Sequence, residues 1–414
     1  MKYAGFSLLL LGAVGLLFGL QFDTSVLTDS GSKVYNIGLL ADKQNVLLVA
    51  GFLVLAGVLL VGFGAISEKT QGTSKLKSNN GVTVFDGKKL TRITYIALLA
   101  LALLAPMLGL YPVFVMKLLC FALFACAFNL LLGFTGLLSF GHAAFFGSAA
   151  YITGYLVKSL SWTPELAILA GAIGAGLIGL VVGAVAIRRQ GIYFAMITLA
   201  IAQMIYFVCL QVPFTGGEDG LQGVPRGNLF GLLPLASDTT MYYFVVAVFV
   251  LCFLLIARIV NSPFGQVLKM IRENEPRAIS LGYHVDRYKL LAFVLSAALA
   301  GLAGSLKTLV MGFATLTDVH WSMSGEVILM TLLGGVGTLF GPVFGAGIVI
   351  SLQNLLADKV GSWVTVIIGV IFVLCVLAFR KGVVGELQAF LERRRNAAKA
   401  VDVAKTSPVA NPHA

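Results

Sequence analysis

The sequence predicts an all-α protein, a polytopic membrane helical bundle of about 10–12 transmembrane helices with glycine-rich interrupted segments. Of its 414 residues, 58% are hydrophobic and only 11% are charged, so a soluble fold would lack the polar side chains that cover a surface. The 47 glycines are typical of helices that approach one another closely inside a bilayer. Apolar runs of about 20 residues, the length that crosses a bilayer, recur along the chain.

The candidate spans are the apolar runs at 3–20, 46–66, 93–111, 114–133, 142–158, 166–187, 192–212, 241–259, 290–311, 324–338, 341–356 and 362–379. The runs at 324–338 and 341–356 are short and rich in glycine, which makes one or both candidates for half-helices. The first run follows Lys2 as the apolar part of a secretory signal would. No small-residue cleavage pattern precedes Gln21, so we interpret this run as the first span.

The basic residues predict the orientation in the membrane. The formal charge of +11 comes in short blocks between apolar runs, a pattern typical of the positive-inside rule and not of a nucleic-acid-binding face. If both termini are cytoplasmic, the inner segments hold most of the 29 Lys and Arg residues. The outer loops then hold only Lys33, Lys43, Lys158, Arg226 and Lys359. Lys117 and Lys307 lie near the outer ends of their spans, where we expect them to snorkel to the interface.

The segment 129–147, NLLLGFTGLLSFGHAAFFG, interrupts apolar sequence with glycines and polar side chains. A broken helix in a bilayer is tolerated only inside protein or beside a watery cavity, so this segment is a candidate wall of a substrate path. Its candidate path residues are Asn129, Thr135, Ser139 and His142. A tight cytoplasmic turn with close helix packing is the alternative. No second metal-ligating side chain stands at ligand spacing from His142, so we expect no metal there.

A second glycine-rich segment, 332–345 (LLGGVGTLFGPVFG), echoes the first and hints at an internal duplication, with chance similarity as the alternative. Just before it, Glu326 is the only acidic residue inside a predicted span. A carboxylate in hydrocarbon is costly unless it is paired or hydrated. Glu326 therefore joins the candidate path residues, and a place at the membrane interface is its alternative interpretation.

The sequence of the loop 261–289 predicts a short amphipathic helix outside the membrane. Pro276 suits the first turn of such a helix and Gly282 suits the position just past its end. Apolar residues follow the charged ones, namely Ala278, Ile279 and Leu281. A docking element for a soluble partner needs such exposed apolar groups, whereas an interfacial helix against lipid headgroups is the alternative. The candidate docking residues are Arg272, Glu273, Glu275, Pro276, Arg277 and Gly282.

The loop 213–238 is rich in glycine and carries Glu218 and Asp219. It is a candidate contact for an external partner or a lid, with a flexible acidic loop as the alternative. All five cysteines lie in apolar runs, so we expect neither disulfides nor a metal site. The chain has no GxxxxGK[ST] phosphate loop and no catalytic motif, so we expect no enzyme activity and no ATP site in this chain.

Several long motifs occur together and in order: NLLLGFTGLLSFGHAAFFGSAAY, RRQGIYFAMITLA, GGEDGLQGVP, RENEPRAISLGYHVDRYKLLAFVLSAALAGLAGSL and LLGGVGTLFGP. With them the chain resembles the LivM-type permeases of branched-chain amino acid ABC importers over nearly all of residues 93–380. The resemblance implies that residues 1–92 are an N-terminal extension with two spans and a basic loop, and that residues 93–380 are the permease. Residues 381–414 are expected to be a disordered cytoplasmic tail, because the end of the chain has no apolar period.

The resemblance also implies function and partners. It implies import of leucine, isoleucine and valine across the bacterial inner membrane, with a LivH-type second permease, two ATPase subunits and a periplasmic amino-acid-binding protein. Residues 272–282 would be the coupling helix in a cleft of an ATPase subunit, and ATP would be hydrolysed by the partners, so no cofactor is expected in this chain. A urea or short-chain amide permease, and a secondary amino acid transporter, are the alternatives.

Overall fold

The computed structural model describes residues 111–231 and 233–360, and elsewhere only short pieces at 10–15, 18–19, 21, 25–27, 33–35, 43, 46, 50, 366–370, 373 and 382. The chain divides into two compact units, Met1–Pro112 with Leu391–Ala414, and Val113–Phe390. In the first unit, β1 (Ser25–Leu27) pairs antiparallel with β2 (Lys33–Tyr35). Most of the spans expected at 3–20, 46–66, 93–111 and 362–379, the basic loop after 46–66, and the tail lie outside the described residues.

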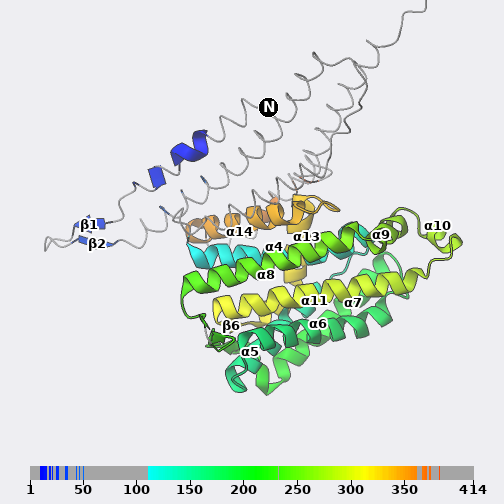
Figure 1. The fold of residues 1–414 in the computed structure, drawn as a ribbon, viewed down its shortest axis with the longest axis horizontal. Coiled ribbons are helices and arrows are strands. Elements are labelled where there is room, and N and C mark those ends of the chain that lie inside the picture. The colour runs from blue at the N-terminus through cyan, green and yellow to red at the C-terminus, as the bar shows by residue number, and fades with distance from the viewer. Residues whose placement is uncertain are drawn as a thin grey trace, which may run out of the picture. The chain divides into compact units, whose positions relative to one another are not determined.

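The second unit is a bundle of helices (Figure 1). Its main helices are α4 (Pro112–Thr135), α5 (His142–Ser159), α6 (Pro164–Ala186), α7 (Ile192–Gln211), α8 (Asp238–Asn261) and α11 (Val285–Met311). Among the described residues, α4, α6, α7, α8 and α11 are long and apolar enough to cross a membrane. Large apolar side chains such as Ile173, Val181 and Met204 remain exposed on α6 and α7, as lipid-facing positions require. The predicted all-α membrane bundle is confirmed.

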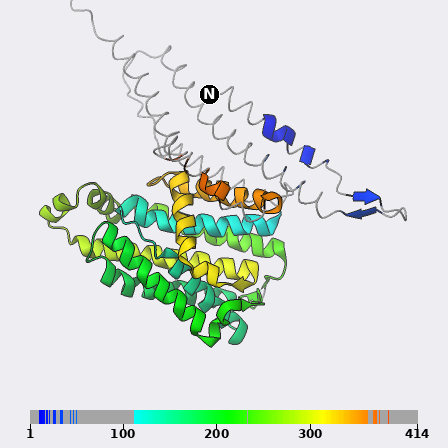
Figure 2. The ribbon, with the colours of Figure 1, turned by 180° about the vertical axis from the view of Figure 1, so that it is seen from behind.

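The two short glycine-rich runs form helices of different length. α14 (Gly341–Val360) has 20 residues, and its apolar stretch Gly341–Leu356 is shorter than the helices that are long and apolar enough to cross a membrane. α13 (Trp321–Gly334) has 14 residues, about 21 Å of helix against a hydrocarbon core of about 30 Å. Figure 2 shows the gold α13 lying steeply across the direction of the cyan α4. Among the described residues, neither half-helix candidate belongs to the helices that are long and apolar enough to cross a membrane.

Close approach of α5, α6 and α11 explains several glycines. A Cβ atom at Gly304 of α11 would collide with the carbonyl oxygen of Phe146 in α5, a backbone atom that cannot rotate away. A Cβ atom at Gly301 would collide with the side chain of Ala175 in α6. Small residues at these crossings let the backbones pack directly, which is the main source of helix association when lipid is the solvent.

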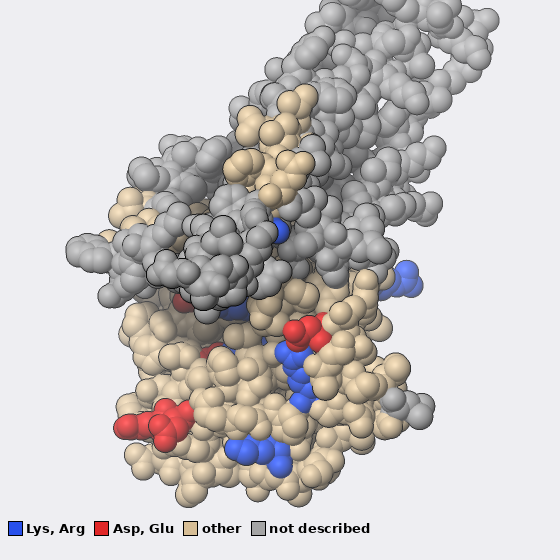
Figure 3. All heavy atoms as spheres, turned by 90° about the vertical axis from the view of Figure 1, so that its left-hand side faces the viewer, with Lys and Arg blue, Asp and Glu red and all other residues tan. Residues whose placement is uncertain are grey.

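The links between helices gather at two opposite ends of the bundle (Figure 1). One end, which we call the α9–α10 end, contains α9 (Pro263–Glu273) and α10 (Glu275–Ser280). At the other, the β3–β6 end, β3 (Leu221–Gln222) pairs antiparallel with β6 (Phe313–Ala314). Figure 3 looks onto the β3–β6 end, where most of the described surface is uncharged and acidic and basic atoms form a few separate patches.

Candidate translocation and coupling site

At the α9–α10 end, the two glycine-rich segments 129–147 and 332–345 lie side by side. The Asn129 side chain joins them: its Nδ2 donates to the carbonyl oxygen of Thr338 at 2.8 Å, and its Oδ1 accepts from the backbone N–H of Gly337 at 2.9 Å. Asn129 lies inside the regular helix α4, and the break before α5 is confined to residues 136–141. One amide side chain thus satisfies two backbone groups of the α13–α14 link.

Arg272 of α9 reaches the same place. Its Nη1 donates to the carbonyl oxygen of Gly133 near the end of α4. A Cβ atom at Gly337 would lie 2.8 Å from this Nη1 atom and would displace the guanidinium, and the φ of +80° at Gly337 also favours glycine. Gly136 has a φ of +82° and lies against the aliphatic part of Arg272. Arg272 therefore links α9 to both α4 and the α13–α14 link.

The expected short helix is present as α10, set off from α9 by a break at Asn274. The Asn274 side chain caps α10 by accepting from the backbone N–H of Arg277 at 3.1 Å. Pro276 lies in the first turn, where its missing N–H leaves no bond unmade. Gly282 follows the helix with a φ of +84°, the conformation that ends many helices. Pro276 and Gly282 therefore lie at the start of α10 and just past its end, as the sequence predicts.

Glu275 faces the bundle. Its Oε1 accepts from Nζ of Lys289 in α11 at 2.7 Å and from Nε2 of Gln190 in the α6–α7 link at 2.9 Å. The Lys289 side chain is buried, so this ion pair is shielded from solvent on one side. Among the candidate docking residues, Glu275 therefore holds α10 on the bundle.

The surface of α10 differs from expectation at one residue. Ala278 is buried against Ile271 and Val285, because it lies on the side of the helix that packs on α9 and α11. Its expected place among the exposed apolar residues is wrong. Ile279 and Leu281 are 58% and 60% exposed. We define the α10 surface as these two residues together with the exposed Glu273 and Arg277.

The candidate path residues of the first segment are buried in this conformation. Thr135 Oγ1 donates to the carbonyl oxygen of Leu130 at 3.3 Å, a bond within its own helix. Ser139 Oγ accepts from the backbone N–H of Gly141 at 3.2 Å and so stabilises the link before α5. Both contacts support the tight-turn interpretation of this segment, while a role of these residues in the path stays a prediction.

His142 lies inside an aromatic cluster. Its Nε2 is 2.9 Å from Ser296 Oγ of α11, and the rings of Phe128, Phe145 and Phe293 meet it edge-on. Its Nδ1 has no hydrogen-bond partner among the described residues. The contacts join α4, α5 and α11, which is the helix-bridging role that a lone histidine most often has. Its place on the path stays a prediction.

Glu326 lies in the second turn of α13, towards the β3–β6 end. Its side chain is half-buried and has a polar contact with Gln353 of α14. Two residues earlier, Ser324 Oγ accepts from the backbone N–H of Ala143 at 2.9 Å and holds α13 against α5. Glu326 is therefore held between helices and has partial access to solvent.

The loop 213–238 has defined contacts. It contains the 3-10 turns η1 (Pro213–Thr215) and η2 (Gly217–Asp219), β3, β4 (Asn228–Leu229) and β5 (Leu233–Pro234). Arg226 Nη2 donates to the carbonyl oxygen of Val310 at the end of α11 at 3.2 Å, and Arg226 Nη1 pairs with Asp238 at 2.6 Å. Glu218 and Asp219 are exposed at the β3–β6 end.

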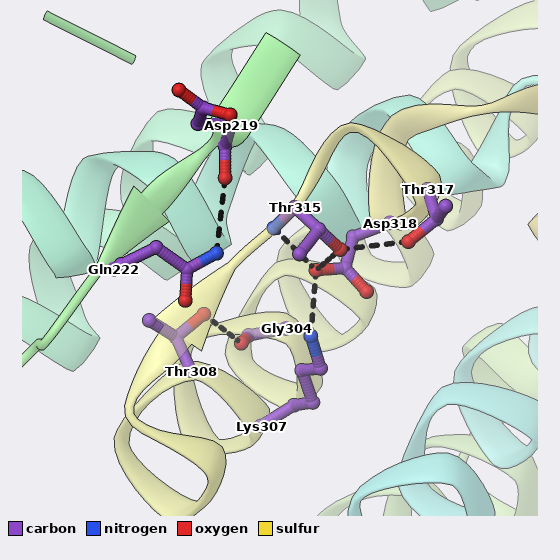
Figure 4. A network of polar contacts seen from close by, with 8 residues as sticks. All are labelled: Asp219, Gln222, Gly304, Lys307, Thr308, Thr315, Thr317 and Asp318. Atoms are coloured by element: carbon purple, nitrogen blue, oxygen red, sulfur yellow. Dashed lines mark hydrogen bonds and ion pairs between the residues drawn. The ribbon is translucent and has the colours of Figure 1, made fainter. Parts of the chain in front are cut away.

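The sequence analysis did not predict a buried ion pair that lies beside this loop. Nζ of Lys307 lies 2.7 Å from Oδ2 of Asp318, and the two side chains are 7% and 3% exposed (Figure 4). Asp318 Oδ2 also accepts from the backbone N–H of Thr315 at 3.0 Å, in a capping box that starts α12 (Leu316–Val319). The expectation that Lys307 snorkels to the interface is wrong, because its buried ammonium group is paired with the Asp318 carboxylate. The Thr-x-x-Asp pattern at 315–318 was the signal in the sequence.

The cysteines Cys120, Cys126, Cys209 and Cys252 are free and buried, and Cys375 lies outside the described residues. Within the described part of the chain, no group of three His, Cys, Asp or Glu side chains is placed to hold a metal ion.

Comparison with known proteins identifies the family. Residues 113–376 match the family described as "Branched-chain amino acid transport system / permease component". The permease LivM of Escherichia coli (strain K12) is 27% identical over 299 residues, 66% of this chain and 69% of that protein. LivM of Salmonella typhimurium (strain LT2) is 29% identical over 256 residues, 56% of this chain and 60% of that protein. LivH of the same Salmonella strain is 26% identical over 286 residues, 64% of this chain and 91% of that protein.

No solved structure matches the chain. The matched regions span 60% to 69% of the two LivM relatives. The resemblance to LivM-type permeases is confirmed, and the chain belongs to the family of permease components of branched-chain amino acid transport systems.

Proposed function

We propose that this chain is a membrane-spanning permease subunit of an ATP-driven, binding-protein-dependent importer of leucine, isoleucine and valine. It forms half of the translocation pathway and docks an ATPase subunit through α10. The observation that carries the proposal is the construction of the α9–α10 end: the α10 surface is exposed, while the residues behind it are bonded to the bundle.

The chemistry of the α10 surface fits a cleft in a soluble protein. Ile279 and Leu281 offer exposed apolar area, and Glu273 and Arg277 offer charges of both signs without a partner among the described residues. Apolar anchors ringed by charges are typical of protein interfaces, where burial supplies affinity and charge supplies orientation. An ATPase subunit is the partner that this family context favours.

Two sets of polar contacts connect α9 and α10 to the bundle and would transmit a movement of α10 to it. Glu275 bonds α10 to α11 through Lys289. Arg272 bonds α9 to α4 through Gly133, and Asn129 extends that contact to the α13–α14 link. Closure of the ATPase subunits on ATP would pull on these bonds and shift α4 and α14 together. That shift is the expected origin of the change between outward and inward openings.

The charged residues at the two ends of the bundle indicate where the remaining partners bind. The α9–α10 end carries Arg188, Arg189, Arg258, Arg272 and Arg277, which favours a cytoplasmic location under the positive-inside rule. The β3–β6 end then faces the periplasm, with Glu218 and Asp219 available to the amino-acid-binding protein. A LivH-type permease completes the pathway in the inner membrane, and ATP is hydrolysed by the two ATPase partners.

The test is purification of the chain in detergent after co-expression with its genomic neighbours. We expect ATPase subunits to co-elute with the wild type and to be lost from the Glu273→Ala, Arg277→Ala double variant. The matched control, Glu218→Ala with Asp219→Ala at the opposite end, retains the ATPase. Failure of any ATPase to co-elute with the wild type would overturn the proposal in favour of a secondary transporter.

Substrate is tested in proteoliposomes that contain the whole complex and its binding protein. We expect ATP-dependent uptake of radiolabelled leucine, with competition by isoleucine and valine. ATP-dependent uptake of radiolabelled urea or acetamide instead, with no leucine uptake, would point to the urea and amide importers.

A further inference from the structure

The hydroxyl groups of Ser148 and Tyr151 lie in the middle of α5 and have no hydrogen-bond partner among the described residues. Both residues are buried, with exposed fractions of 6% and 2%. A serine inside a helix often bonds to the carbonyl oxygen one turn before it, but Ser148 Oγ does not. Buried side-chain hydroxyls in proteins are nearly all bonded, so two without a partner on one helix indicate a constraint other than stability.

The two unbonded hydroxyls share one side of α5, because positions three apart in a helix are neighbours on its surface. Thr153 shows the contrast on the side that packs on α6 and α11. Its Oγ1 lies 2.7 Å from Oγ of Ser305 in α11 and 3.1 Å from the carbonyl oxygen of Ala167 in α6. The hydroxyl on the side towards the bundle core is therefore bonded, whereas the two on the other side are not.

α12 and β3 cover the side of α5 that carries the unbonded hydroxyls. A Cβ atom at Gly147 would lie 2.8 Å from the backbone nitrogen of Val319 in α12. A Cβ atom at Gly154 would lie 2.7 Å from the side chain of Leu221 in β3. Tyr151 lies on the same stripe of α5 as these two glycines, between the contact with α12 and the contact with β3.

α7 packs beside the same part of α5. Just before α5 begins, the backbone N–H of Phe140 donates to Oγ1 of Thr198 in α7 at 3.2 Å. Near the other end of α5, the rings of Tyr155 and Phe214, the latter in η1 just after α7, lie 5.6 Å apart. Along α5, the two unbonded hydroxyls lie between these two contacts.

An aromatic contact joins the two elements that cover the hydroxyls. The ring of Tyr206 in α7 lies 5.4 Å from the ring of His320, the residue between α12 and α13. The backbone of His320 is extended, so the helix is broken there, and a break in a bilayer is tolerated only inside protein or beside a watery cavity. Because α5, α7 and α12 contact one another in pairs, the unbonded hydroxyls lie at the junction of the three.

We propose that Ser148 and Tyr151 line the translocation path and bind the polar head group of the transported amino acid, and that the Tyr206–His320 contact closes the path in the conformation described. The inference rests on the proposed import function and names residues for it. A hydroxyl can donate to a carboxylate and accept from an ammonium, and a zwitterionic amino acid carries both groups. The two hydroxyls gain a partner when α7 and α12 separate and the substrate enters.

The first test uses uptake of radiolabelled leucine, below half-saturation, by the whole complex in proteoliposomes. Ser148→Ala and Tyr151→Phe remove only the hydroxyl oxygens. Each is expected to lower uptake roughly tenfold, since a hydrogen bond to a charged group contributes about one decade of affinity. ATPase co-elution should be unchanged. The matched control Thr153→Val removes a bonded hydroxyl from the same helix and should retain most of the uptake. Uptake at the wild-type level in both hydroxyl variants would overturn the proposal.

The second test separates substrate binding from a role in the fold. In mixed detergent micelles, Tyr151→Phe should leave the midpoint of unfolding unchanged or raise it, because its hydroxyl has no partner in the closed conformation. Thr153→Val should lower the midpoint, because its hydroxyl is bonded to neighbouring helices. A fall for Tyr151→Phe as large as that for Thr153→Val would assign the tyrosine hydroxyl to the fold and overturn the proposal.

A third measurement does not depend on leucine uptake. The Ser148→Cys and Thr153→Cys variants of the whole complex are treated with a small water-soluble methanethiosulfonate, with and without ATP, and compared with the wild type, whose cysteines in the described part of the chain are buried. We expect the Ser148→Cys variant to react while ATP is hydrolysed and leucine to slow that reaction, whereas the Thr153→Cys variant stays at the wild-type level. Absence of reaction at Ser148→Cys in every condition would overturn the site. Absence of leucine uptake by the wild type, by contrast, would overturn the proposed function.

Discussion

Replacement of Lys307 by methionine should be one of the most destabilising single changes in the bundle. The substitution keeps most of the side-chain volume but leaves the Asp318 carboxylate without its cation. The two side chains are 7% and 3% exposed and their charged atoms are 2.7 Å apart, so water cannot take the place of the lysine. Breaking a buried pair by removal of one partner costs about 3–5 kcal/mol of unfolding free energy.

The double variant Lys307→Met, Asp318→Asn should recover most of that loss. Asparagine carries no charge that could be left unpaired, and its Oδ1 can still accept from the backbone N–H of Thr315 at the start of α12. Replacement of both members of a buried pair by neutral groups is often close to neutral in stability. The variants therefore form a cycle in which the double variant is more stable than Lys307→Met alone.

The assay is the midpoint of unfolding of the purified chain in mixed detergent micelles as denaturing detergent is increased. Lys158→Met is the matched control: this lysine lies at the same end but is exposed, and its bond is to the backbone of Gln222. We expect the control to change stability by no more than about 1 kcal/mol. If Lys307→Met loses no more stability than the Lys158→Met control, the buried pair is refuted and the snorkelling interpretation is restored.

Three further changes test other contacts. Asn129→Leu leaves two backbone groups of the α13–α14 link without their hydrogen-bond partner and should lower the unfolding free energy by about 1–3 kcal/mol in the same assay. Leucine uptake should fall while ATPase co-elution persists, and normal uptake would refute transmission through this contact. Glu275→Gln removes the charge that holds α10 on the bundle, so limited proteolysis should cut the residues after α9 faster; unchanged cleavage would contradict that role. Gly304→Val collides with the Phe146 backbone and should cost about 1–3 kcal/mol or more, whereas Gly325→Ala, beside open space, should be tolerated; equal effects would contradict the packing.

Much of the architecture was predictable because its signals are local. Apolar runs of bilayer length predicted α4, α6, α7, α8 and α11, since a helix needs about 20 apolar residues to cross the hydrocarbon core. The short α10 was predictable from Pro276 and Gly282, because helix starts and ends depend on backbone conformation at one or two residues.

The contacts within the candidate site were harder to predict from the sequence. Asn129 is bonded to a link more than 200 residues away, and nothing near it in the sequence indicates that partner. Arg272 and Glu275 belong to the candidate docking residues, and each also bonds to the bundle, Arg272 to Gly133 of α4 and Glu275 to Lys289 of α11. Only the folded chain separates the charged side chains that hold a helix in place from those that it presents to a partner.

The sequence by itself determined that this is a helical membrane protein, where the spans α4, α6, α7, α8 and α11 lie and which loop folds into α10. Tertiary structure decided which polar groups meet: Lys307 with Asp318, and Asn129 with the α13–α14 link. The physical reason is the solvent. In water, an amphipathic pattern marks the buried face of each helix, but lipid and protein interior are both apolar, so that pattern is weak and the partners emerge only from packing.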